Sequence, residues 1–137
     1  MKQEEKQLLL KDLCARQFYN TKVLGPWEKD GPCELSAIDL TSDRQVRVFE
    51  DWYKIEEVKP YLRPMSSMTV EEEYEYHQCK SIDCLDICEM EHEEMLETGA
   101  LWFSHAIDWL NKKGFDYRGL IPMGLALEAP KDMYEIK

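Results

Sequence analysis

Cysteines and histidines gather in one stretch of the chain, where their spacing raises the question of a metal site. Cys84, Cys88 and His92 follow one another at intervals of four residues, so they share a face if this stretch is helical. His77 and Cys79 lie just before them. Thiolate and imidazole are good zinc ligands, but zinc sites bring close ligand pairs together from two separate arms. Because this spacing is absent, we predict buried apolar thiols, with no metal and no cofactor. A metal site formed by Cys79, Cys84, Cys88 and His92 is the alternative.

Acidic residues are concentrated in the same part of the chain. The sequence has 28 acidic and 17 basic residues, a net charge of −11. Residues 69–98 hold eleven acids and one base, Lys80, so this segment alone carries −10. Such a block is costly unless water or a cationic partner screens it. It is therefore either a solvated helical face or a docking surface for a basic protein, one version being a DNA mimic that occupies a nucleic-acid-binding enzyme. The carboxylates expected to meet that partner are Glu71, Glu72, Glu75, Glu89, Glu93, Glu94 and Glu97.

Signatures of catalysis are missing from the sequence. There is no Gly-x-Ser-x-Gly elbow and no phosphate-binding glycine loop. Cys14 or Cys33 could pair with His105 in a nucleophilic site, but nothing in the sequence places them together. We expect His105 to be a partly buried structural residue and the chain not to be an enzyme. An enzyme whose site is invisible in the sequence remains an alternative.

The segment 44–63 mixes cations with aromatic residues, a combination that can hold phosphates and stack bases. Four acids lie among the five bases, so its net charge is only +1. Core aromatics with a mixed surface explain it better, and a small nucleic-acid-associated protein is the alternative. The net charge of the whole chain argues against a duplex-DNA binder. The cations are Arg44, Arg47, Lys54, Lys59 and Arg63, and the aromatics are Phe49, Trp52, Tyr53 and Tyr61.

Hydrophobic periodicity and turn signals predict a single α+β domain over residues 1–137, with an N-terminal helix, a small antiparallel sheet with a hairpin, and a helical C-terminal half. In the first helix, leucines such as Leu9 and Leu13 face the core and polar residues such as Asp12 and Arg16 surround them. Thr69 and Glu72 form a capping-box pattern before another helix. The predicted elements are a helix over 3–16, strands over 21–24, 35–40 and 45–49, a helical turn at 55–58, helices over 70–79 and 84–113, and a strand near 125–127.

The last predicted helix has a well-marked end and an aromatic face. Gly114 suits the left-handed cap, and Phe115 can pack back on the last turn. Trp102 and Trp109, seven residues apart, share one face. We expect them to pack against the hairpin and the helix 3–16. A homodimer seam is the alternative, because aromatic residues also anchor interfaces.

Size and composition predict a cytoplasmic protein. A chain of 137 residues with 44% hydrophobic residues can bury its own core. Its purely apolar runs are only a few residues long, such as the three leucines Leu8 to Leu10, against the roughly 20 residues that a bilayer helix needs. Five cysteines, an odd number, do not make a disulfide framework. We therefore expect reduced thiols and no membrane association.

Two stretches, 58–69 (VKPYLRPMSSMT) and 108–130 (DWLNKKGFDYRGLIPMGLALEAP), carry a resemblance. They resemble uncharacterised small proteins encoded in prophages and mobile elements of gut anaerobic bacteria, over about a quarter of the chain. These proteins have no assigned activity, so the resemblance implies no functional residue. It implies a bacterial cytoplasmic setting and a phage-related role. Together with the acidic segment, it favours a non-catalytic interaction protein that binds a basic protein partner.

Overall fold

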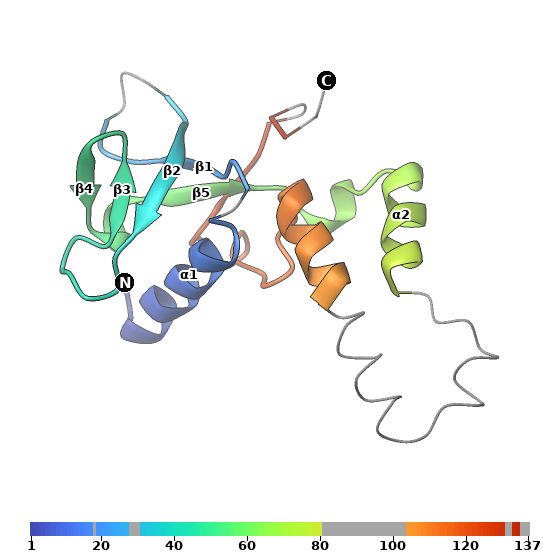
Figure 1. The fold of residues 1–137 in the computed structure, drawn as a ribbon, viewed down its shortest axis with the longest axis horizontal. Helices are drawn as coiled ribbons and strands as arrows, with labels where there is room; N and C mark the ends of the chain where they lie inside the picture. The colour runs from blue at the N-terminus through green and yellow to red at the C-terminus, as the bar shows by residue number, and fades with distance from the viewer. Residues whose placement is uncertain (18, 28–30, 81–103, 131–132, 135–137) are drawn as a thin grey trace.

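A computed structural model describes residues 1–17, 19–27, 31–80, 104–130 and 133–134 (Figure 1). These residues form a sheet accompanied by helices, which confirms the predicted α+β class. A further helix covers residues 104–113. The labelled elements are α1 (Gln3–Ala15), β1 (Lys22–Leu24), β2 (Cys33–Ile38), β3 (Val46–Val48), β4 (Asp51–Tyr53), the 3-10 turn η2 (Ile55–Glu57), β5 (Lys59–Leu62), the 3-10 turn η3 (Met65–Ser67), α2 (Val70–Lys80) and β6 (Leu127–Glu128).

The six strands lie in the order β4-β3-β2-β1-β5-β6. Neighbours from β4 to β5 are antiparallel, as predicted, whereas β6 adds to β5 in parallel. The predicted hairpin is confirmed as β2 and β3, with Leu35 opposite Val48 and Ile38 opposite Val46. A one-residue irregularity between Leu35 and Ala37 shifts the register within this pair.

Strand β5 was not predicted from the sequence, because two prolines obscure it. Pro60 lies inside the strand opposite Val23 of β1 and is fully buried. Proline has no N–H to donate and is therefore unusual within a sheet. Just after β5, Arg63 pairs with the segment that follows the helix 104–113. The Arg63 N–H donates to the Gly114 carbonyl at 2.7 Å, and the Asp116 N–H donates to the Arg63 carbonyl at 2.8 Å.

The core lies between α1 and the sheet (Figure 1). Leu9 and Leu13 of α1 are fully buried, as are Val23, Val48 and Leu62 of the strands. The spacing of four between the two leucines places both on the face that meets the sheet. The apolar side of the predicted helix 3–16 is thus confirmed.

The polar side of the same helix differs from the prediction. Asp12 and Arg16, expected around the apolar stripe at the surface, are both completely buried. Their spacing of four suits an ion pair along one helix face, and the Arg16 Nε donates to Asp12 Oδ2 at 2.8 Å. The pair lies beneath the segment that follows the helix 104–113, since Arg16 Nη2 also donates to the Phe115 carbonyl at 2.6 Å.

Two helices form the side of the molecule away from the sheet, α2 and 104–113 (Figure 1). The capping box of α2 is confirmed, since the Glu72 N–H donates to Thr69 Oγ1 and the Thr69 N–H to Glu72 Oε1, each at 3.1 Å. The helix 104–113 ends as predicted, with Gly114 at φ 80° and the Phe115 N–H donating to the Leu110 carbonyl at 2.9 Å.

Aromatic packing at this end of the molecule also departs from the prediction. Trp109 packs on Tyr76 of α2 and on Phe115, with ring centroids 5.6 and 5.7 Å apart, rather than on the hairpin. Trp102 lies outside the described residues. His105, expected to be partly buried, is exposed, whereas Ala106 and Leu110 of the same helix are buried.

Candidate functional site

The predicted partner-binding carboxylates divide into two groups. Glu71, Glu72 and Glu75 lie on α2 and are described by the structure. The other four lie outside the described residues, namely Glu89, Glu93, Glu94 and Glu97. The three on α2 have different surroundings and differ in exposure.

Glu72 is held by the protein itself. Its two carboxylate oxygens accept hydrogen bonds from Arg63 Nη1 at 2.7 Å and Nη2 at 2.6 Å. Only 14% of the Glu72 side chain is exposed. These bonds, reinforced by those from Thr69, lower the pKa of Glu72 to about 2, against the opposing effect of its partial burial. Glu72 thus begins α2 and attaches the helix to the end of β5, while its predicted contact with a partner stays a prediction.

We expect Glu72→Gln to make stability less dependent on pH. The folded-state pKa lies below the usual 4.5, so the carboxylate stabilises the fold above pH 4.5, and this contribution is lost as the pH falls towards about 2. Urea unfolding at pH 7 should show a loss of about 1–3 kcal/mol for the variant. The difference between the variant and the wild type should shrink steadily below pH 4. Glu73→Gln, an exposed change one residue away, is the control, and an equal loss in both variants would contradict the assignment.

Glu75 is partly engaged. Trp109 Nε1 donates to its Oε2 at 3.2 Å, and Lys113 Nζ lies 4.0 Å from the same oxygen. About half of the side chain, 53%, remains exposed. These contacts connect α2 to the helix 104–113 and leave only part of the Glu75 carboxylate for a partner.

The outward side of α2 carries exposed acids beside exposed apolar side chains. Val70 and Tyr74 are 83% and 67% exposed and, four residues apart, lie on one face. Glu71 and Glu73 are also exposed and flank them. Glu73 lies 3.9 Å from His77, whose ring is charged only when protonated. We call Val70, Glu71, Glu73 and Tyr74 the α2 outer face.

A second charged cluster is buried beneath α1. The carboxylate of Asp12 receives Arg16 Nε at 2.8 Å and Arg16 Nη2 at 3.2 Å, and Arg118 Nε lies 3.2 Å from it. Both guanidinium groups also lie over the ring of Tyr117, with each Cζ 5.1 Å from its centroid. One buried carboxylate therefore serves two arginines, and Arg16 Nη1 finds no acceptor in the described part of the chain.

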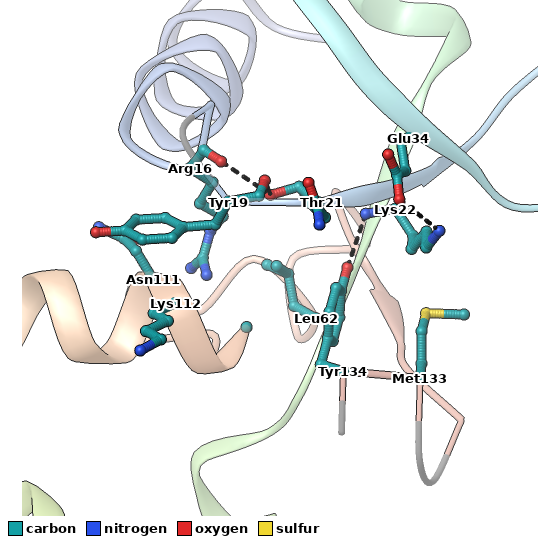
Figure 2. Close-up of a pocket in the computed structure, with 12 residues that line it drawn as sticks. Arg16, Tyr19, Thr21, Lys22, Glu34, Leu62, Asn111, Lys112, Met133 and Tyr134 are labelled. Atoms are coloured by element: carbon teal, nitrogen blue, oxygen red, sulfur yellow. Dashed lines mark hydrogen bonds and ion pairs between the residues drawn. The ribbon is translucent and has the colours of Figure 1, made fainter. Parts of the chain in front are cut away.

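Two pockets adjoin each other at Tyr134. The first, the Arg16 pocket, has a volume of about 410 Å³ and is lined by residues including Arg16, Tyr19, Lys22 and Lys112 (Figure 2). The second has a volume of about 530 Å³, and its charged lining consists of Arg63, Glu71, Glu72, Glu75, Lys113 and Glu128. The first pocket has more bases than acids and the second more acids than bases.

Tyr134 is fixed between these pockets by two hydrogen bonds. Its hydroxyl donates to the Tyr61 carbonyl at 2.5 Å and accepts from the Lys22 N–H at 2.9 Å. Burial raises the pKa of this phenol to about 12, so it stays protonated and can donate. A Cβ on Gly114 would lie 2.7 Å from the Tyr134 ring, which requires glycine there for packing as well as for its positive φ.

The cysteines and histidines singled out in the sequence lie partly inside and partly outside the described residues. No group of three or more potential metal ligands occurs among the described residues. Cys33 is buried and donates from Sγ to the Gly31 carbonyl, whereas burial raises the pKa of Cys14. Cys84, Cys88, His92 and the side chain of Cys79 lie outside the described residues.

Among the basic residues of segment 44–63, Arg63 is engaged in the fold, whereas Arg44, Lys54 and Lys59 are exposed. Arg63 binds Glu72 and lies over the Phe115 ring, with its Cζ 4.2 Å from the centroid. Tyr53 packs edge-on against Trp27, with centroids 4.8 Å apart. Phe49, in contrast, is 59% exposed at the turn between β3 and β4. The sequence did not indicate that Arg16, at the end of α1, is buried or that a pocket lies beside it.

Comparison with known proteins adds no relative. No protein-family model matches the chain, and no curated protein or solved structure matches it either. None of the described helices is long and apolar enough to cross a membrane. The geometry and charge of the site residues are therefore the basis for inferring a function.

Proposed function

We propose that this chain is a non-catalytic interaction protein that binds a basic protein partner through its acidic segment, with the α2 outer face as the described part of the contact. The observation that carries the proposal is the combination on α2 of exposed carboxylates, Glu71 and Glu73, with the exposed side chains of Val70 and Tyr74. An acid-flanked apolar surface complements a segment that alternates Lys or Arg with apolar residues.

Physical chemistry supports both parts of this contact. The net charge of −11 attracts a cationic partner from a distance and speeds its association. At short range, the face of the Tyr74 ring can take an Arg or Lys cation, and the exposed methyl groups of Val70 can be covered by an apolar side chain. Charge complementarity alone raises the association rate but adds little affinity, so Val70 and Tyr74 are needed for a stable contact.

The setting of this interaction is part of the proposal. The resemblance of residues 58–69 and 108–130 to prophage-encoded proteins supports a bacterial cytoplasm and a phage-related role. In that setting a nucleic-acid-binding protein is a natural basic partner, because its phosphate-binding groove would accept carboxylates in place of phosphates. Competition between this chain and a duplex oligonucleotide for the partner would distinguish a DNA mimic from other interaction proteins.

A matched pair of variants tests the proposed contact. We expect E71Q/E73Q to bind an arginine-rich amphipathic peptide roughly tenfold more weakly than the wild type, since two exposed charge contacts contribute roughly 0.5–1 kcal/mol each. The control, D43N/E50Q, removes two exposed charges elsewhere and has the same net charge, so it should bind like the wild type. Fluorescence anisotropy of labelled peptide at low and high salt makes the measurement. Equal weakening in both variants, or no binding by the wild type at low salt, would refute the proposed face.

A further inference from the structure

Arg16 combines complete burial with incomplete hydrogen bonding. Its guanidinium has five N–H groups, and those on Nε and Nη2 have acceptors in Asp12 and the Phe115 carbonyl. The two N–H groups of Nη1 have no acceptor among the described residues, although the whole side chain is buried. Buried polar groups in proteins are nearly always satisfied, so an unsatisfied guanidinium nitrogen points to a missing acceptor.

The nitrogen belongs to a side chain that lines the Arg16 pocket. Figure 2 shows the guanidinium descending from the end of α1 towards Asn111 and Leu62, which line the same pocket. Nη1 itself is shielded from water in this structure, so a ligand can reach it only if a lining side chain moves. The acceptor that is missing in the fold can thus be supplied from this pocket.

The charge around the pocket suits an anion. Its lining contains three bases, Arg16, Lys22 and Lys112, and one acid, Glu34, in a chain whose net charge is −11. Lys22 Nζ is already paired with Glu34 at 3.1 Å. Among the described residues, Asp12 is the carboxylate bound to Arg16, and Arg16 shares it with Arg118. Asp12, Arg16 and Arg118 together therefore carry one net positive charge, and Lys112 adds a second beside the pocket.

The size and walls of the pocket indicate an organic ligand rather than a bare inorganic ion. Its volume of about 410 Å³ lies within the range of small-molecule sites, about 300–1,000 Å³. Met133 and the ring of Tyr19 supply apolar surface beside the cations, and Leu62 lies behind them. An inorganic ion would use the cations and leave these walls uncovered.

We propose that the Arg16 pocket binds a small organic anion, whose carboxylate or phosphate oxygen accepts from Arg16 Nη1 while its charge faces Lys112. Guanidinium N–H groups match both kinds of oxyanion in geometry and charge. This site is separate from the α2 outer face, so either proposal can fail while the other holds.

Calorimetric titration of the whole protein tests the site at constant ionic strength. The probes are glucose 6-phosphate and succinate as organic anions, inorganic phosphate as the bare oxyanion, and glucose as the uncharged control. We expect one of the organic anions to bind more tightly than inorganic phosphate and to raise Tm, and glucose to do neither.

Two charge-reversal variants test whether the organic anion binds in the Arg16 pocket. Lys112→Glu changes an exposed residue of the pocket rim and should weaken organic-anion binding roughly tenfold. Lys11→Glu makes the same charge change at an exposed position of α1 that does not line the pocket, so its affinity should equal that of the wild type. The proposal is wrong if neither organic anion binds, if inorganic phosphate binds as tightly as both of them, or if the two variants lose affinity equally.

Discussion

Asp12→Asn should destabilise the protein by about 3 kcal/mol, because removing one member of a buried ion pair leaves the other charge uncompensated. Arg16 is fully buried, and Asp12 is the carboxylate to which it is bound. The amide that replaces the carboxylate can still accept a hydrogen bond but no longer offsets the charge of either Arg16 or Arg118. The measurement is the free energy of unfolding from urea denaturation at pH 7.

An exposed aspartate provides the control for this prediction. Asp43→Asn makes the same chemical change in the exposed link between β2 and β3, where we expect a change within about 0.5 kcal/mol. A loss below about 1 kcal/mol for Asp12→Asn would show that the buried arginines are satisfied without this carboxylate.

Phe115→Ala should destabilise the protein by about 3–5 kcal/mol, since truncating a fully buried aromatic ring removes its contacts and leaves a cavity. The Phe115 ring is completely buried. It stacks on Trp109 with centroids 5.7 Å apart and lies under the Arg63 guanidinium at 4.2 Å. Its loss therefore weakens the contact of the helix 104–113 with β5 and the position of Arg63, which holds Glu72.

The same substitution at an exposed ring controls for the loss of aromatic surface. Phe49 is 59% exposed and already has a positive φ of 57°, so Phe49→Ala does not alter the backbone strain. We expect its free energy of unfolding to stay within about 0.5 kcal/mol of the wild type. If both alanine variants lose the same free energy of unfolding, the buried ring of Phe115 contributes no more to packing than the exposed ring of Phe49.

Local signals in the sequence predicted local structure well. The capping box at Thr69 and Glu72, the polar link between β2 and β3, and the glycine end at Gly114 each involve residues a few positions apart. Their physical causes, an unpaired helix amide, a turn and a left-handed backbone, are complete within those few residues. The prediction therefore needed no knowledge of the rest of the chain.

Long-range contacts could not be predicted in the same way. Arg16 and Asp12 have the spacing of an ordinary surface ion pair, and only the Phe115 segment, 99 residues from Arg16, makes them a buried cluster. Glu72 likewise appears in the sequence as one acid among many, and it is Arg63 that neutralises it. In both cases a distant cation or chain segment decides whether a charge is free for function.

The carboxylates of the acidic segment show the same difference between local signals and long-range contacts. Its charge could be counted from the sequence, but its availability depends on which carboxylates the fold neutralises. Of the three candidates that the structure describes, Glu72 is fully engaged, Glu75 is partly engaged, and Glu71 is exposed. The proposed contact is accordingly smaller on α2 than the predicted one, and it gains Val70 and Tyr74 as apolar anchors.

A titration of the isotope-labelled whole protein with the arginine-rich amphipathic peptide, followed through its backbone amide resonances, tests the central claim most directly. We expect the amide resonances of the α2 outer face, those of Val70, Glu71, Glu73 and Tyr74, to shift on addition of peptide and to return when salt is added. Peptide binding that leaves these resonances unchanged would show that the α2 outer face is not the binding surface.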